Sequence, residues 1–544
     1  MFSKLSKLFN NLNKTERCIF GGAAVILIVS LFFFLAQKFY DIAVEAPASG
    51  GHYTEGVIGQ PTTLNPLLTG GNEADRDLTE LLFANLADLV EKITPSEDHK
   101  TWDVVLKEAV RWSDGETLTT ADIVFTIEMI QNPDTQSPLF TTWNGIVTER
   151  LSDKEVRLSV RNPYGFFQDN LNSLKIVPKH IFANIPPSNL RLSNFNLEPV
   201  GSGPYKFISY ERNKDGFVTK YHLKANELYG KNKPYVEFFT FKFFKNQKEA
   251  LDGFNRKEID GLGAIDPKKF DELKISHQSY SLNTPRYYAI FLNQSAHPAL
   301  KDKAVRNGLA QSVNRSQIIS SVFNNHAMLV NGPILSIIDG YDPNVYKESG
   351  ADLEAIKKSL DKAGWKVNEK TGYRMEFNLA VPQIQFLIDA AELIKKDWEQ
   401  IEIKLDYTVS DVSGINETIK IRNYQMILFG NILRGNPDTF SFWHSSERFY
   451  PGLNLAVYNN KKVDDILESI RKELDAESRK KKLSQLQEIF YSDNPAIFLF
   501  SPNYIYAVPK NLGGFKMKIL VLPSDRFKNV NEWYLKTARV LKLR

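Results

Sequence analysis

The chain has 544 residues, of which 42% are hydrophobic and 24% charged, which is ordinary for a globular protein and excludes disorder on a large scale. Its single cysteine excludes an intramolecular disulfide and thiolate metal chemistry. The net charge of +4 is small for this length, so we expect no nucleic-acid partner. One hydrophobic core stops growing well below 544 residues, and two or more lobes are therefore expected.

An uncharged apolar run from Cys18 to Ala36 stands near the N-terminus. As a helix it would be about 28 Å long, close to the ~30 Å hydrocarbon core of a bilayer. Basic residues cluster before the run, and the single lysine after it is soon balanced by acids, which places the rest of the chain outside the cytoplasm. The basic residues before the run are Lys4, Lys7, Lys14 and Arg17. We expect a cytoplasmic stub (1–17), a transmembrane anchor (18–37) and a tether (38–52).

A cleaved signal peptide is the alternative to an anchor, because Ala46 and Ala48 offer a small-residue cleavage site. The apolar run is longer than a usual signal core and ends well before these alanines. A lipid-modified cysteine would follow the apolar stretch, whereas Cys18 opens it. We therefore expect an uncleaved, single-pass anchor in the cell membrane, with the bulk of the chain periplasmic or extracellular.

Beyond the tether, strand and helix patterns alternate irregularly, which predicts a mixed α/β fold of several layers. Turn residues and apolar alternation predict strands, and apolar residues at helical spacing predict helices. The expected strands are 54–60, 235–244, 288–292 and 503–508. One expected helix begins at Thr120 and ends at Asn132-Pro133. The other expected helices cover 303–323, 351–363, 385–400 and 463–490. The first of these ranges is expected to break into two helices near Asn314, and the last also contains two helices.

The chain contains no recognisable catalytic signature: HExxH, the nucleotide-binding P-loop and G-x-S-x-G are absent from the sequence. Gly201-Ser202-Gly203 is interpreted as a tight turn. The eight histidines are scattered, so we expect no metal site and no cofactor, and only His444 is a candidate ligand for a nickel chelate. Trp143 and Trp443 lie beside polar turns, a setting that suits the wall of a ligand cleft.

Residues 110–130, VRWSDGETLTTADIVFTIEMI, resemble the hallmark of the family 5 extracellular solute-binding proteins, the oligopeptide-, dipeptide- and nickel-binding components of ABC importers. In physical terms Asp114-Gly115 forms a turn, Thr119 or Thr120 caps a helix, and Asp122 lies favourably in its first turn. Other segments resemble the family in the right order, so the resemblance covers about residues 53–510. These segments are 59–68, 177–180, 199–207, 226–260 and 291–319.

The resemblance implies two lobes joined by crossing strands, with an extra subdomain in the first lobe and ligand held between the lobes. The expected parts are lobe I (53–75, 195–285 and 505–544), the subdomain (76–194) and lobe II (286–504). The implied function is capture of peptides or similar solutes by a monomer that serves an ABC permease and its ATPase, without catalysis. An exported membrane-anchored hydrolase and a non-transport solute sensor are the alternatives.

The ligand-binding positions of the family match this sequence in part. The family's first-lobe ligand strand resembles Gln60 to Thr63, and its second-lobe cleft loop resembles 430–437, which includes Asn431. Peptide-binding members hold the α-amine with an aspartate at the position of Leu433. Arg434 beside it would repel an amine and attract a carboxylate. We expect ligands with an anionic or neutral group at that end, unless Arg434 faces solvent or pairs within lobe II, or another acid (Asp438 or Glu447) replaces the missing one.

Overall fold

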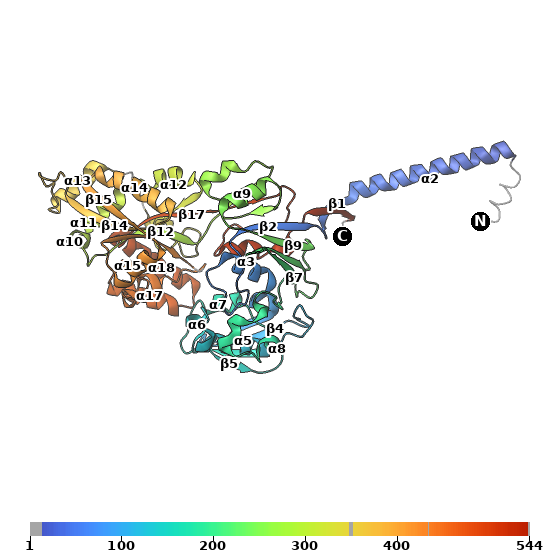
Figure 1. The fold of residues 1–544 in the computed structure, drawn as a ribbon, viewed down its shortest axis with the longest axis horizontal. Coiled ribbons are helices and arrows are strands. Elements are labelled where there is room, and N and C mark those ends of the chain that lie inside the picture. The colour runs from blue at the N-terminus through green and yellow to red at the C-terminus, as the bar shows by residue number, and fades with distance from the viewer. Residues whose placement is uncertain (1–12, 347–351, 434, 542–544) are drawn as a thin grey trace.

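The computed structural model describes residues 13–346, 352–433 and 435–541. The body contains two lobes and a smaller subdomain, each with its own sheet (Figure 1). A long helix, α2 (Lys14–Ile42), projects from the end of lobe I that lies away from lobe II. The two-lobed α/β fold with an extra subdomain is confirmed.

Lobe I has a seven-stranded sheet in the order β11-β18-β10-β2-β9-β8-β7. Its strands β10, β2 and β9 run parallel, so their carboxyl ends lie at one edge. Helix α9 (Gln247–Asn255) packs on this sheet, and α3 (Glu73–Leu82) packs against η7 (Pro523–Phe527). The strands are β2 (His52–Ile58), β7 (Tyr205–Arg212), β8 (Val218–Ala225), β9 (Phe238–Phe244), β10 (Gly261–Leu262), β11 (Gln278–Leu282) and β18 (Tyr504–Val508).

Lobe II has a six-stranded sheet in the order β13-β17-β12-β16-β14-β15. One face is covered by α10–α14 and the other by α16–α18, and each side has its own apolar core. The strands are β12 (Arg286–Leu292), β13 (Ala327–Leu329), β14 (Met375–Pro382), β15 (Ile403–Ser410), β16 (Met426–Ile432) and β17 (Ala496–Pro502). The helices are α10 (Pro298–Lys301), α11 (Lys303–Ser312), α12 (Arg315–Phe323), α13 (Leu353–Lys362), α14 (Gln385–Glu399), α15 (Val412–Ile421), α16 (Phe440–Trp443), α17 (Lys461–Lys472) and α18 (Ala476–Asp493).

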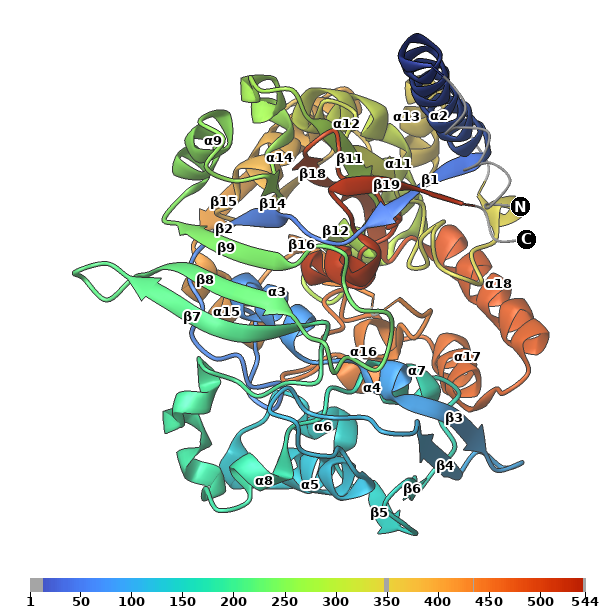
Figure 2. The ribbon, with the colours of Figure 1, turned by 90° about the vertical axis from the view of Figure 1, so that its right-hand side faces the viewer.

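The subdomain lies below lobe I in both views and has a four-stranded antiparallel sheet (Figure 2). Its apolar core is continuous with that of lobe I, so the two are packed together as one body. The strands are β3 (Val90–Pro95), β4 (Thr101–Leu106), β5 (Val147–Arg150) and β6 (Glu155–Ser159). The helices are α4 (Leu86–Leu89), α5 (Thr120–Gln131), α6 (Phe140–Trp143), α7 (Phe167–Ser173) and α8 (Lys179–Phe182).

Several predicted helix ends are confirmed because they depend on local caps. Thr119 and Asp122 form a capping box at the start of α5. Asn314 caps α12 with its side chain, which separates that helix from α11. Helix ends of this kind are encoded by a few neighbouring residues.

Two neighbouring chain crossings join the lobes. One runs from β11 through residues 283–285 into β12, and the other runs from β17 through Asn503 into β18. The Ser501 hydroxyl donates to the Thr284 carbonyl, and the Thr284 hydroxyl donates to the Pro502 carbonyl, both at 2.8 Å. These bonds hold the crossings side by side as a hinge pair, next to the expected boundaries of lobe II.

The segment expected as a tether, 38–52, is partly built into regular structure. Helix α2 continues to Ile42, and β1 (Ala43–Ala48) pairs antiparallel with β19 (Lys536–Leu541) at the other end of the chain. Arg539 also donates to the Tyr40 carbonyl at 3.1 Å. The sequence indicated only a tether here, but a partner strand almost 500 positions away decides the conformation of β1.

A buried ionic cluster ties the two ends of the chain together in lobe I. Arg526 of η7 lies between Asp77 of α3, at 2.6 Å, and Glu55 of β2, at 3.0 Å. All three side chains are at most 2% exposed. Burial raises the pKa of Glu55 to about 7 and that of Asp77 to about 6, although Arg526 opposes both shifts.

Candidate functional site

The two sheets direct their carboxyl ends toward each other across the hinge. In lobe I, β2, β9 and β10 end at this edge. In lobe II, the parallel strands β14, β15 and β16 end at the edge from which β12 begins. Ligands of open α/β sheets bind outside the carboxyl ends of parallel strands. The space between the two edges is therefore the candidate ligand cleft.

Apolar side chains remain exposed along both edges. Ile58 at the end of β2 is 39% exposed, and Ile384 and Ile432 on lobe II are 42% and 47% exposed. Ile384 and Ile432 border a cavity of about 130 Å³ at the lobe II edge, which Arg286 and Tyr288 of β12 also line. Concave apolar surface with a few polar groups is typical of a solute site.

The lobe I edge is shaped by hydrogen bonds around Asp75. Its carboxylate accepts from the backbone N–H groups of Thr62 and Thr63 and from the Thr62 hydroxyl, at 2.6 to 3.1 Å. Burial raises the pKa of Asp75, and these donors oppose the shift. The Gln60 side chain accepts from the Val218 N–H at 2.9 Å. Gln60 and Thr63 therefore hold this loop in shape, and Thr62 beside them is exposed.

Three residues expected on the cleft wall lie in apolar cores. Trp143 is 3% exposed and packs against Phe167 inside the subdomain. Trp443 is fully buried against Phe291 and Phe490, and Leu433 is 1% exposed in the same lobe II core. Polar neighbours in sequence suggested a cleft wall for the two tryptophans, and the family resemblance suggested it for Leu433, but burial of large apolar surface decides their positions.

Of the other predicted lobe II site residues, one borders the cavity and one lies outside the described residues. Asn431 is 4% exposed and donates to the Tyr287 hydroxyl at 2.9 Å, while it borders the lobe II cavity. Arg434 lies outside the described residues, so its expected role stays a prediction. Arg286 was missed, because a single arginine ahead of a predicted strand carries no signal of its own. Only strand pairing shows that it lies opposite Ile432.

The loop after β16 joins lobe II to the subdomain. The Tyr164 hydroxyl donates to the Asp438 carboxylate at 2.8 Å, and Arg471 of α17 donates to the same carboxylate at 2.9 Å. The Gly165 N–H donates to the Arg471 carbonyl at 2.8 Å. Both views place α17 beside α7 of the subdomain. We call Tyr164, Gly165, Asp438 and Arg471 the latch. Asp438 is thus paired with Arg471 rather than left free for a ligand amine.

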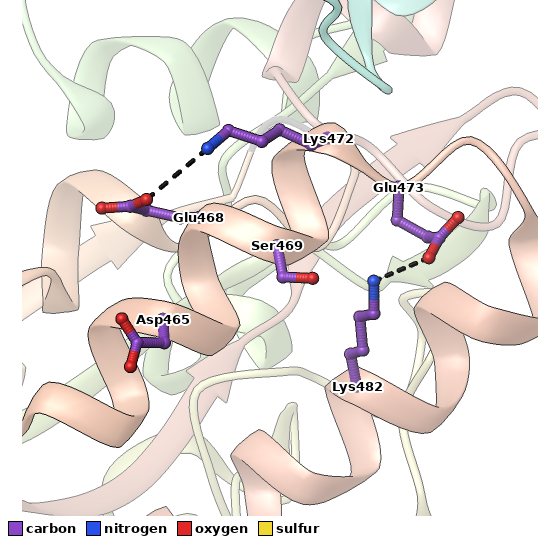
Figure 3. Close-up of a pocket in the computed structure, with 6 residues that line it drawn as sticks. All are labelled: Asp465, Glu468, Ser469, Lys472, Glu473 and Lys482. Carbon is purple, nitrogen blue, oxygen red and sulfur yellow. Dashed lines mark hydrogen bonds and ion pairs between the residues drawn. The ribbon is translucent and has the colours of Figure 1, made fainter.

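A larger hollow of about 350 Å³ lies between α17 and α18, and its lining is charged (Figure 3). Lys482 pairs with Glu473 at 2.6 Å, and Lys472 pairs with Glu468 at 3.6 Å. These pairs lie on α17 and α18 of lobe II, and the hollow is thus separate from the cavity at the sheet edge that faces lobe I.

His444, the candidate ligand for a nickel chelate, lies among aromatic and polar neighbours. His444 stacks on Phe440, with 4.1 Å between ring centroids, and its Nδ1 lies 2.8 Å from the Ser446 hydroxyl. In the described parts of the chain, no three His, Cys, Asp or Glu side chains are grouped to hold an ion.

A hinge pair, two facing sheet edges and a latch define a two-lobed solute-binding clamp. The family model of the bacterial extracellular solute-binding proteins, family 5, matches residues 86–449. The chain belongs to this family, whose members are extracytoplasmic solute-binding components of ABC importers.

Individual relatives agree with this assignment. The oligopeptide-binding protein AppA of Bacillus subtilis is 29% identical over 518 residues, which cover 90% of this chain and 92% of AppA. The structure of AppA with a nonapeptide matches at a TM-score of 0.70 and 25% identity, over 90% of this chain and all of that one. The substrate-binding protein CtaP of Listeria monocytogenes matches at a TM-score of 0.79 and 22% identity, over 90% and 99% of the two chains. These relatives are solute-binding proteins rather than enzymes.

Proposed function

We propose that this protein captures peptides or similar solutes outside the cytoplasm and delivers them to an ABC permease. The facing carboxyl ends of two sheets across a hinge pair carry the proposal, because this arrangement lets two walls close on one solute. The nonapeptide in the AppA structure supports peptides as the solute class. In this proposal a monomer binds the solute, and a separate ATPase supplies the transport energy.

Peptides should bind without an acid that holds their α-amine. Leu433 is buried in lobe II, and Asp438 is paired in the latch. We therefore expect N-acetylated and free forms of one peptide to bind within about threefold of each other, because no desolvated amine–carboxylate pair would be lost. The peptide is identified by mass spectrometry of solutes that co-purify with the protein. Isothermal titration calorimetry of its free and N-acetylated forms then measures the ratio of the two affinities.

Loss of binding on acetylation would show that an amine-holding carboxylate exists. Hydrolysis of the bound peptide would favour the hydrolase alternative, and a metal chelate among the co-purified solutes would favour a nickel-type ligand instead. If no solute co-purifies with the protein and the protein binds no peptide, the proposal is contradicted.

We also propose that α2 is retained as a membrane anchor. Lys14–Lys38 is long and apolar enough to cross a membrane, and its apolar window is not buried by the body. Removal of the chain up to Ala48 would also delete β1 and leave β19 unpaired. N-terminal sequencing of the protein from the membrane fraction should find a start upstream of Cys18, which means that residues 18–36 are kept. A mature N-terminus near Ser49 would show a cleaved signal peptide.

A further inference from the structure

Among the described residues that line the lobe II cavity, Arg286 is the one that carries a charge. The cavity lies at the sheet edge that faces lobe I, where β14 and β16 end. Its walls are mainly apolar and aromatic, and no carboxylate lines it in the part of the chain that the structure describes. The wall residues that matter here are Arg286, Tyr288, Ile384, Leu387, Phe429 and Ile432.

Arg286 differs from the other covered arginines of lobe II. Arg306 donates to the Asp493 carbonyl at 2.7 Å, and Arg374 pairs with Glu402 at 2.8 Å. The buried Nε of Arg286, by contrast, has no hydrogen-bond partner among the described residues. Burying a hydrogen-bond donor of a cation costs free energy unless an acceptor pairs with it. Within the protein the Arg286 guanidinium interacts with the Tyr288 hydroxyl, and because Arg286 lines the cavity, a solute bound there can supply a further partner.

The backbone holds Arg286 firmly in this position. It is the first residue of β12, directly after the crossing residue Pro285, and pairs with Ile432 of β16. Because side chains alternate along a strand, Arg286 and Tyr288 point to the same face. The Tyr288 ring lies over Gly430, where an added Cβ would stand 2.8 Å from the ring. Gly430 therefore leaves the space that the Tyr288 ring occupies.

We propose that Arg286 binds a carboxylate of the solute, and that Ile384, Leu387 and Ile432 contact an apolar group next to that carboxylate. The inference rests on the proposed function and names a chemical feature of the solute. A guanidinium matches a carboxylate with two parallel hydrogen bonds, and the apolar wall strengthens them by excluding water. The carboxylate can belong to a peptide C-terminus, to an acidic side chain or to another organic acid.

Two small probes that differ only in the carboxylate test the proposal. N-acetyl-leucine and N-acetyl-leucinamide are titrated into the full-length protein in detergent, with isotope-labelled Ile and Leu methyl groups followed by NMR. The acid should shift the methyl signals of Ile384, Leu387 and Ile432 and bind about tenfold or more tightly than the amide, as expected for a charge-assisted pair.

Substitutions then assign the preference to one residue. Arg286→Gln should remove the preference for the acid, and Arg286→Lys should keep part of it, because the charge remains but the two-pronged geometry is lost. Arg157→Gln, at a surface arginine of the subdomain, is the matched control and should change nothing. Melting temperatures check that each variant is folded.

Equal binding of acid and amide would overturn the proposal, as would an unchanged preference in Arg286→Gln or absence of shifts at the three methyl groups. If the co-purified solute binds Arg286→Gln as tightly as the unaltered protein, Arg286 is not a solute contact, but the clamp function stands. If the unaltered protein binds no solute at all, the proposed function itself fails.

A second readout separates a peptide C-terminus from other sources of the carboxylate. A peptide found among the co-purified solutes is compared with its C-terminally amidated form. Weaker binding of the amidated form, lost in Arg286→Gln, places the C-terminus at Arg286. If amidation has no effect but replacement of an acidic side chain of the peptide does, the carboxylate is that of the side chain.

Discussion

Replacement of Arg526 by methionine should lower the free energy of unfolding by about 3–5 kcal/mol, because removal of one partner from a buried ion pair leaves uncompensated charge. In this variant Glu55 and Asp77 would face each other without the guanidinium that now lies between them. Chemical denaturation followed by circular dichroism measures the change. Since the cluster joins β2, α3 and η7, lobe I and the ends of the chain should lose stability first.

Arg157→Met is the matched control, because Arg157 also makes a two-pronged contact with a carboxylate, that of Asp103, but the pair is 40% and 35% exposed. Exposed pairs contribute about 1 kcal/mol or less. A loss in Arg526→Met no larger than in this control would show that water or repacking compensates the buried carboxylates. A triple variant that adds Glu55→Gln and Asp77→Asn to Arg526→Met should recover part of the loss, because it removes the unpaired charges.

Gly165→Val should open the clamp and weaken solute binding about tenfold or more. A Cβ at Gly165 would lie 2.7 Å from the Glu473 carbonyl oxygen and 3.4 Å from that of Arg471, so the subdomain could not seat on lobe II. The same change disturbs the Gly165 N–H bond to Arg471 and the neighbouring contact of Tyr164 with Asp438. If only the closed form holds solute well, the apparent affinity falls with the population of that form.

Small-angle scattering of the protein with its co-purified solute should show a larger radius of gyration for Gly165→Val than for the unaltered protein. Gly230→Val is the control, because an added Cβ at Gly230 meets no atom within 4 Å. Titration with the same solute gives the change in affinity. Unchanged size and affinity would mean that closure does not depend on the latch.

The sequence by itself determined the features that depend on neighbouring residues. The apolar run from Cys18 to Ala36 marked α2, and Thr119 with Asp122 marked the start of α5. Asn314 marked the break between α11 and α12. Caps and turns are encoded within a few positions, and the collinear family segments extended these local signals to the two-lobed fold.

Tertiary structure alone decided which side chains face the cleft. On β12, Arg286 and Tyr288 point to the cavity, whereas the neighbouring Tyr287 is buried in the opposite core. Alternation along a strand gives two faces, but only pairing with β16 and packing of the helices decide which face is covered. The same holds for β1, which reads as a linker until β19, encoded at the far end of the chain, supplies its hydrogen-bond partners. Non-local pairing of this kind has no local sequence signature, and it placed Arg286 beside the cleft, while packing of apolar side chains placed Trp443 in a core.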